Sequence, residues 1–464
     1  MSWFRVLRIF ILVGLFAGVS WAETKVTKVA CIGDSITVGH GVREKAVNAY
    51  PALLGSWLGP KYQVKNFGVG GATMQKVSKL TYWKQKKFKQ ALAYEPDIVV
   101  IFLGTNDANL SNKNWKGAAV FSKDYMAMLD LFLALKSHPK IYLCYPVPAY
   151  PGDAGRRDKV MESEVLPAIK KVATKYHLPT IDLFTALSHH RAFFPDKLHP
   201  NGEGHKLIAK TIYQSLTGKW DWDLPADQSK FHIFFMMGQS NMEGHAKVLP
   251  QDRVPVPHIV MLRGKTGDIW LPAAHPLGNR NTFGLGLSFA KEYLKHHPGV
   301  TVGIVNCANG GVPIDRLKKG TNTYNDILRK IKIANHDGVI TAALWHQGES
   351  DTISENFVNS YDQKLTQLIT DFRADVGNPT LPFVIGDLAE FYGTSKDHNA
   401  PDRLKRINQI RRVLRSIKDH VKYVGFVESA GLKSSDQHMV HFDKASYVIF
   451  GKRYEQVLEK LLQK

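Results

Sequence analysis

Short apolar runs alternate with longer amphipathic segments along nearly the whole chain. In the first half, near-continuous apolar runs predict strands at 28–33, 63–69, 97–104, 140–147 and 179–183. Apolar positions at helical spacing predict helices at 121–137, 165–177 and 204–216. Strands that are apolar along their whole length are typical of parallel sheets covered on both faces. The first half is therefore expected to be a three-layer α/β/α domain.

The same alternation starts again at Phe231. Strands are predicted at 231–238, 300–311, 339–348, 381–389 and 421–428, and helices at 323–335, 361–377 and 402–418. Pro, Gly and Asp interrupt the pattern between the two halves. We therefore expect two tandem α/β/α domains, at 23–218 and 231–464, each with a mainly parallel sheet, joined by a linker at 219–230.

The N-terminus has the pattern of a signal peptide. Arg5 and Arg8 precede an apolar run that ends in the small residues Ser20 and Ala22. The run of about 14 residues is short for a membrane span. Residues 1–22 are therefore predicted to be removed during export to the periplasm or the extracellular space, with an uncleaved signal anchor as the alternative. No stable membrane insertion is expected.

Composition is that of a globular protein, with 464 residues, 44% hydrophobic and 22% charged. The net charge is +20, and loss of residues 1–22 would lower it by two. The lysines and arginines are scattered along the predicted helices, so a solvated basic surface is favoured over a nucleic-acid partner. Cys31, Cys144 and Cys307 stand in apolar runs, which favours buried thiols over a disulfide framework.

Residues that could hydrolyse an ester follow the predicted strands of the first half. Ser35 follows the first strand, Gly71 the second and Asn106 the third, while Asp196 and His199 precede the last helix. Ligands bind at the carboxyl ends of parallel strands, so these residues are expected to meet. A serine nucleophile needs a histidine base, that histidine needs an acceptor for its other ring nitrogen, and the developing oxyanion needs N–H donors. Each motif alone also occurs in helix caps and turns.

The four stretches "GDSI", "VGGAT", "GTND" and "DKLH" resemble the four sequence blocks of the SGNH (GDSL-type) hydrolase superfamily. The resemblance spans nearly all of the first domain. It implies that Ser35 is the nucleophile, that Gly71 and Asn106 belong to the oxyanion hole, and that Asp196 and His199 are the acid and the base.

The second half contains "GQSNMEGH", "NCANGG", "WHQGESD" and "VHFDKASY", which look like the domain shared by sialate O-acetylesterases and some acetyl xylan esterases. This domain is a divergent SGNH branch. The resemblance implies Ser240 as nucleophile, Gly311 (or Gly310) and Gln347 in the oxyanion hole, and His441 as base.

The acid partner of His441 is left open by the sequence. The position three residues before it holds His438, and neutral imidazole stabilises an imidazolium poorly. Asp436 would need an unusual loop path, whereas Glu349 follows a predicted strand, and some acetyl xylan esterases of this type are thought to use that glutamate. We therefore hypothesise a triad of Ser240, His441 and Glu349, with Asp436 as the alternative. The His438-x-x-His441 pair could also bind zinc, but no further ligand cluster is evident, so neither a metal nor a cofactor is expected.

Together these features predict an exported carbohydrate esterase that hydrolyses O-acetyl esters of oligo- or polysaccharides through acyl-serine intermediates. The alternatives are a lipase or arylesterase, or one catalytic domain beside a non-catalytic glycan-binding domain. Arg156, Arg157 and Trp270 are weaker candidates for a sugar cleft, with a solvated turn and core packing as the alternatives.

Overall fold

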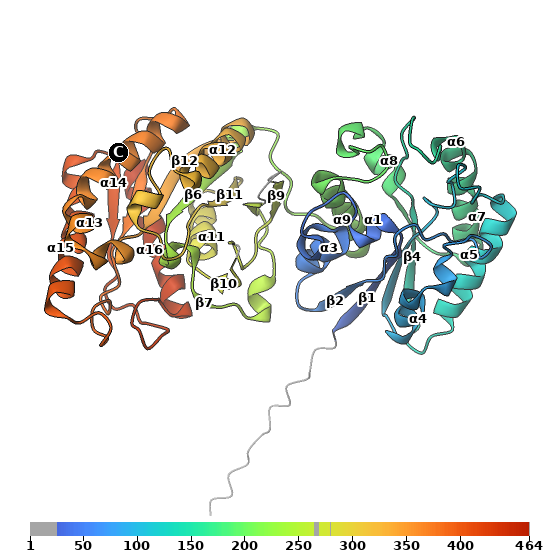
Figure 1. Ribbon diagram of the computed structural model, residues 1–464, viewed down its shortest axis with the longest axis horizontal. Coiled ribbons are helices and arrows are strands. Elements are labelled where there is room, and N and C mark those ends of the chain that lie inside the picture. The colour runs from blue at the N-terminus through green and yellow to red at the C-terminus, as the bar shows by residue number, and fades with distance from the viewer. Residues whose placement is uncertain (1–25, 264–268, 279, 464) are drawn as a thin grey trace, which may run out of the picture.

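The computed structural model describes residues 26–263, 269–278 and 280–463, and within these it consists of two α/β domains (Figure 1). The predicted signal peptide at 1–22 lies outside the described residues. Among the helices of the described part, none has the length and apolar character needed to cross a membrane.

The first domain is built on a parallel five-stranded sheet with the order β2-β1-β3-β4-β5. Its strands are β1 (Thr27–Gly33), β2 (Tyr62–Asn66), β3 (Ile98–Phe102), β4 (Lys140–Tyr145) and β5 (Thr180–Asp182). β1 therefore lies inside the sheet, with β2 and β3 on either side.

Helices cover both faces of this sheet, as the strand pattern predicts. They are α1 (Ser35–Val38), α2 (Lys45–Asn48), α3 (Tyr50–Leu58), α4 (Lys86–Ala93), α5 (Ala118–Leu133), α6 (Asp158–Val160), α7 (Leu166–Tyr176), α8 (Leu183–Ser188) and α9 (Gly202–Thr217). Alternate residues of β1 point to opposite faces. Val29 and Cys31 join the core under α3 and α9, whereas Ala30 and Ile32 join the core under α4, α5 and α7.

The second domain has a seven-stranded sheet with the order β14-β13-β12-β6-β11-β8-β9, in which only the β8–β9 pair is antiparallel. Its strands are β6 (Phe231–Gly238), β8 (Ile259–Arg263), β9 (Ile269–Pro272), β11 (Thr301–Asn306), β12 (Val339–His346), β13 (Phe383–Gly386) and β14 (Val424–Val427). A separate small antiparallel pair consists of β7 (Ala246–Lys247) and β10 (Thr282–Phe283).

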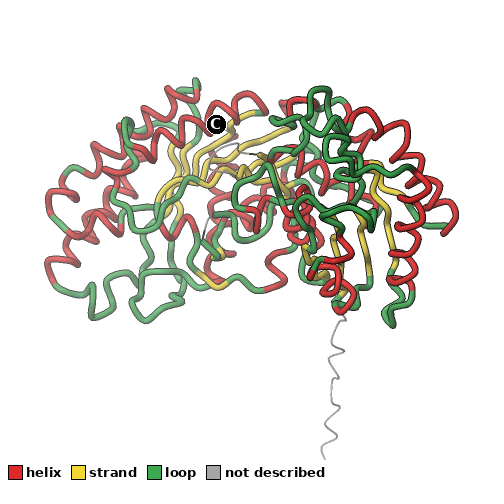
Figure 2. Tube along the Cα trace, turned by 45° about the vertical axis from the view of Figure 1, so that its right-hand side comes forward, coloured by secondary structure: helices red, strands yellow, loops and turns green. Residues whose placement is uncertain are grey.

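Helices again enclose the strands of the second domain (Figure 2). They are α10 (Ser240–Glu243), α11 (Gly286–His296), α12 (Asn322–Asp337), α13 (Glu355–Asn359), α14 (Tyr361–Val376), α15 (Pro401–His420) and α16 (Lys444–Leu462). The fold class is thus the predicted one: two three-layer α/β/α domains with mainly parallel sheets.

Aromatic side chains anchor the segment between α9 and β6. Trp220 packs edge-to-face against Trp57 and Tyr213 of the first domain. Trp222 packs on Trp220, and its indole N–H donates to the Val256 carbonyl of the second domain (2.7 Å). The predicted linker at 219–230 is therefore packed against both halves.

Candidate active sites

Each nucleophile candidate starts a single helical turn directly after an interior strand. Ser35 begins α1 after β1, and Ser240 begins α10 after β6. Both serines are nearly buried, 6% and 5% exposed. Asp34 caps α1, because its carboxylate accepts the Ile36 N–H (2.9 Å). The two serines are thus fixed at equivalent places, at the carboxyl ends of their sheets.

In the first domain, the three predicted relay residues lie in line. The Ser35 hydroxyl is 2.9 Å from His199 Nε2, and His199 Nδ1 is 2.6 Å from Asp196 Oδ2. The other oxygen of Asp196 accepts the backbone N–H groups of His199 (2.6 Å) and Leu198 (3.0 Å). Asp196 therefore fixes both the loop and the imidazole ring.

In the second domain, the same relay is formed with Asp436 as the acid. Ser240 Oγ is 3.0 Å from His441 Nε2, and His441 Nδ1 is 2.7 Å from Asp436 Oδ2. Asp436 also accepts the backbone N–H groups of His441 (3.2 Å) and Val440 (3.3 Å). Asp436 thus fixes both its loop and the imidazole ring, as Asp196 does, although its backbone hydrogen bonds are divided between its two oxygens.

The predicted contact between Glu349 and His441 is therefore wrong. Glu349 is buried, and its Oε1 accepts the Asn241 side-chain N–H (2.7 Å) and lies 3.2 Å from His346 Nε2. Asn241 in turn donates to the Val440 carbonyl (2.9 Å). Glu349 thus supports the turn that carries Ser240 and the loop before His441, from behind the relay.

Left-handed residues give the two acid loops their shape. In the first domain, Lys197 follows Asp196 directly with a φ of 69°, and the loop reaches His199 in three residues. In the second domain, Met439 has a φ of 55° and donates its N–H to the Asp436 carbonyl (3.2 Å). This extra turn absorbs two additional residues, so Asp436 reaches the ring nitrogen from five positions away.

A glycine loop of the same pattern follows the strand beside each nucleophile strand, β2 in the first domain and β11 in the second. Both have the sequence Asn-x-x-x-Gly-Gly, beginning at Asn66 and Asn306. Gly71 and Gly311 have the same φ of 74°, a left-handed conformation that other residues adopt only with strain. Gly311 lines the same pocket as Ser240. The predicted oxyanion glycines are thus equivalent in backbone conformation.

In the first domain, the amide of Asn106 is held by two neighbours. Its Nδ2 donates to the Ala72 carbonyl (3.2 Å), and its Oδ1 accepts from the guanidinium of Arg157 (3.4 Å). Arg157 is itself buried, with its Nη1 2.6 Å from Asp153 and its Nε donating to the Thr105 carbonyl (3.0 Å). Arg157 is therefore neither a solvated turn residue nor a sugar-cleft residue; it orients the Asn106 amide.

In the second domain, the prediction for Gln347 needs correction. Its side chain is completely buried, and its Nε2 has three acceptors: Val312 O (3.1 Å), Gln239 Oε1 (3.2 Å) and the Asp351 carboxylate. An amide nitrogen has only two hydrogens, so Gln347 has none left for an oxyanion. Since its amide is used to fix the surrounding loops, Gln347 is a supporting residue.

Gln239, directly before the nucleophile, is the candidate for the oxyanion donor in place of Gln347. Its Oε1 accepts from Gln347 Nε2 and from the backbone N–H groups of Gly348 (3.4 Å) and Ser350 (3.3 Å). These donors fix which end of the amide is the oxygen. Its Nε2 has no acceptor among the described residues, and Gln239 lines the pocket. The only sign of Gln239 in the sequence was its place directly before the nucleophile in "GQSN".

Comparison with known proteins gives a consistent assignment for both halves. Residues 230–460 match the family model of carbohydrate esterases described as sialic acid-specific acetylesterase, and residues 31–207 match the GDSL-like Lipase/Acylhydrolase family. A probable carbohydrate esterase of Arabidopsis thaliana is 31% identical over 190 residues, which cover 35% of this chain and 72% of that protein. The chain belongs to the carbohydrate esterase family.

An acetylxylan esterase of Xylanibacter ruminicola is 38% identical to this chain over 203 residues, which cover 40% of this chain and 42% of the relative. The chain thus spans about two fifths of that relative's length. A solved structure of an Arabidopsis thaliana protein is 26% identical and covers 49% of this chain and 98% of its own, with a TM-score of 0.43.

Electrostatics differ between the relay acids and the acids that hold the loops. Burial acts to raise the pKa of Asp196 and Asp436, but hydrogen bonds from the histidines outweigh it, so both pKa values lie below the usual range. Burial instead raises the pKa of Asp107 and Asp351 to about 6. Asp107 accepts the Met74 N–H at 2.8 Å, so a buried carboxylate supports the loop after Gly71.

Among the described residues, one group of potential metal ligands coincides with the second relay. His245, Asp436 and His441 place ligand atoms within 4.8 Å of one another. His438 is outside this group, since its Nδ1 lies 2.6 Å from Asp397. His438 therefore contacts Asp397 and His441 contacts Asp436, so the two histidines do not face a common ligand. That the reaction needs no metal stays a prediction.

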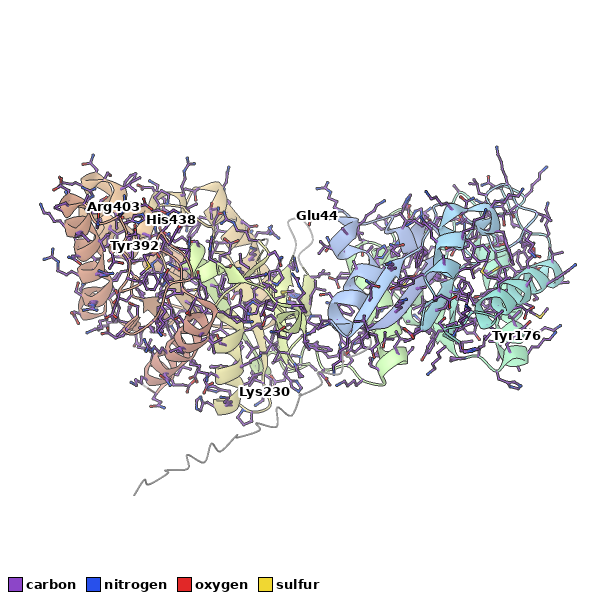
Figure 3. All side chains as sticks on the ribbon, turned by 90° about the horizontal axis from the view of Figure 1, so that it is seen from below. Glu44, Tyr176, Lys230, Tyr392, Arg403 and His438 are labelled. Carbon is purple, nitrogen blue, oxygen red and sulfur yellow. The ribbon has the colours of Figure 1, made fainter. Side chains whose placement is uncertain are left out.

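Ser240 lines a pocket of about 390 Å³. Arg280, Arg403, His245 and His398 contribute its basic lining. The guanidinium of Arg403 donates to the Tyr392 hydroxyl (2.9 Å), and Figure 3 shows these two side chains and His438 gathered in one region of the second domain. Trp270 is not part of this pocket: it is a core residue whose indole donates to Asp337 (2.7 Å).

Proposed function

We propose that the protein is an exported carbohydrate O-acetylesterase with two active sites, which hydrolyses acetyl esters on sugars through acyl-serine intermediates. The observation that carries the proposal is the repeated relay. Ser35 with His199 and Ser240 with His441 each form a hydroxyl–imidazole contact within 3.0 Å, and each imidazole contacts an aspartate. Two loops of different length thus give the same serine–histidine–aspartate contacts.

The reaction follows from this geometry. His441 Nε2 takes the proton of Ser240 as its oxygen attacks the acetyl carbonyl, and Asp436 stabilises the imidazolium that forms. The backbone N–H groups of Ser240 and Gly311 and the Gln239 amide are available to the oxyanion. The imidazolium then protonates the departing sugar oxygen, and a water activated by the same histidine releases acetate. His199, Asp196 and Asn106 have the matching roles in the first site.

The substrate class is supported by the pocket and by the relatives. Most side chains that line the Ser240 pocket carry a polar or charged group, with Ile353 and Val440 as apolar exceptions, and carbon atoms form the larger part of its surface. Such a lining suits a hydroxyl-rich sugar better than the acyl chain of a lipase substrate. The matching names, sialic acid-specific acetylesterase and acetylxylan esterase, both describe enzymes acting on acetylated sugars.

The test is to remove each nucleophile separately. Ser35→Ala, Ser240→Ala and the double variant would be assayed for acetate release from p-nitrophenyl acetate and from a panel of acetylated polysaccharides. Each single variant should lose the activity of one site, and the double variant should lose all of it. Ser215→Ala, an exposed serine on α9, serves as the control.

Two outcomes would contradict parts of the proposal. If Ser35→Ala loses nothing on any ester, the first domain is not an esterase and is better explained as a glycan-binding domain. If the double variant retains activity, the acyl-serine mechanism is wrong. Export is tested separately, by N-terminal sequencing of the secreted protein, which should start after Ala22.

A further inference from the structure

Both domains repeat a histidine that the relays do not use. The stretches "GDSITVGH" and "GQSNMEGH" share the pattern Gly-x-Ser-x-x-x-Gly-His. His40 therefore follows Ser35 by five residues, and His245 follows Ser240 by five residues. The two domains have little sequence identity outside the site motifs, so the repeated histidine suggests that it has the same role in both sites.

Local backbone geometry turns each of these histidines toward the base. The single-turn helices α1 and α10 end at Gly39 and Gly244, which have φ values of 96° and 100°. A side chain at Gly244 would overlap the backbone of Phe283, within 2.5 Å. Glycine is therefore required where the chain reverses, and the reversal places the next side chain beside the relay.

The two histidines meet the bases at different angles. His245 stacks on His441 with 3.6 Å between ring centroids and 7° between planes, whereas His40 lies 5.4 Å from His199 at 38°. The difference follows from the glycines, whose ψ angles are 148° at Gly244 and 36° at Gly39. His40 also lies beside the oxyanion loop, where a side chain at Gly70 would be 3.8 Å from its Nε2.

The ring nitrogens of His40 and His245 are available for a ligand. Both side chains are exposed, and neither makes a side-chain hydrogen bond within the part of the chain that the structure describes. Partial burial, reinforced by the neighbouring His441, lowers the pKa of His245 against the opposing effect of Asp436. Partial burial, Lys45 and His199 likewise lower the pKa of His40. A neutral imidazole has one donor and one acceptor, which is the complement of a sugar hydroxyl.

We propose that His245, and His40 in the first site, are specificity residues that hydrogen-bond a sugar hydroxyl next to the ester being hydrolysed. His245 lines the pocket together with Ser240, Gly311 and His441. It lies against the face of the ring that protonates the leaving oxygen, so a hydroxyl on the adjacent sugar carbon comes within its reach. This inference rests on the proposed sugar-ester activity and deepens it.

The test separates the contribution of ring stacking from that of hydrogen bonding by the ring nitrogens. In the Ser35→Ala background, His245→Phe retains a flat ring against His441 but has no hydrogen-bonding group, whereas His245→Gln retains a donor and an acceptor. Each is assayed on p-nitrophenyl acetate, which has no hydroxyl, and on a mono-O-acetyl methyl xyloside with a free neighbouring hydroxyl. His336→Phe, on the exposed end of α12, is the control.

The expected result is a selective loss. His245→Phe should lower kcat/KM on the acetyl xyloside about tenfold more than on p-nitrophenyl acetate, because one neutral hydrogen bond is lost, and His245→Gln should recover part of this difference. Equal losses on both substrates, or no loss on either, would overturn the inference and leave His245 a packing partner of His441. A parent enzyme that cleaves p-nitrophenyl acetate but no acetylated sugar would instead overturn the proposed function, and the inference with it.

Discussion

Replacing Asp436 by asparagine should disable the second site. The assay uses the Ser35→Ala background, so that only Ser240 contributes. Asparagine has nearly the same shape, but the N–H groups of Val440 and His441 bond to different oxygens of Asp436, so its single amide oxygen can keep only one of these two bonds. The backbone bonds from Met439 N–H to the Asp436 carbonyl and from Ser435 N–H to the His441 carbonyl remain, so the loop should persist. What is removed is the negative charge 2.7 Å from His441 Nδ1. The imidazolium that forms during acylation would then lack its counter-ion.

The size of the effect can be bounded from this distance. Two unit charges 2.7 Å apart attract by about 1.5 kcal/mol in bulk water and by about 6 kcal/mol at an effective dielectric constant of about 20. The side chains of His441 and Asp436 are 19% and 22% exposed, so the loss should fall between these limits. We expect kcat to fall about 10²- to 10³-fold, at roughly 1.4 kcal/mol per factor of ten.

Glu349→Gln is the matched comparison, because it removes the other carboxylate near the relay. Its contacts are with Asn241 and His346, so it should lower the melting temperature and reduce kcat by less than about tenfold. Both variants are assayed for kcat and KM at pH 7 after circular dichroism confirms folding. If folded Glu349→Gln loses more kcat than Asp436→Asn, the assignment of the acid is refuted.

Three further outcomes are expected. Gln239→Ala should lower the kcat of the second site about 10²-fold with little change in KM, since it removes an oxyanion donor; an unchanged kcat would exclude that role. Arg157→Met should lower the kcat of the first site, because Asn106 loses the guanidinium that orients its amide, and activity on p-nitrophenyl acetate in the Ser240→Ala background measures this. Burial raises the pKa of Asp107 to about 6, above an unfolded value of about 3.9, so its contribution to stability is present below about pH 4 and lost as pH rises through 6. Asp107→Asn should therefore flatten the fall in melting temperature between pH 4 and 7, and an unaltered slope would contradict this.

The fold was largely predictable because its strands are buried on both faces. The runs around Val29, Val99 and Phe234 are apolar at nearly every position, which leaves a parallel sheet as the simple solution. The β8–β9 pair was not predicted. Its strands, Ile259–Arg263 and Ile269–Pro272, pair antiparallel at the edge of the sheet. Five sequence positions separate them, which is too few for the crossover connection that a parallel pair needs.

The site residues were predictable where a strand end or a short loop alone determines which side chains meet. Ser35, His199 and Asp196 depend on one strand end and one three-residue loop, and the structure brings them together as expected. Asp436 and Gln239 could not be chosen from spacing, because their contacts depend on a left-handed turn and on the orientation of a buried amide. Sequence spacing alone determines neither of these.

The two halves show which feature of the relay is constrained. The position before the nucleophile is Asp34 in one domain and Gln239 in the other, and the aspartate lies three residues before the histidine in one and five in the other. The distances from the carboxylate to the ring nitrogen are nevertheless 2.6 and 2.7 Å. The constraint thus acts on the position of the charge relative to the imidazole, and the loop length adapts to it. Because the Asp196 side chain is 56% exposed and that of Asp436 only 22%, we expect water to screen the charge of the first relay more strongly than that of the second.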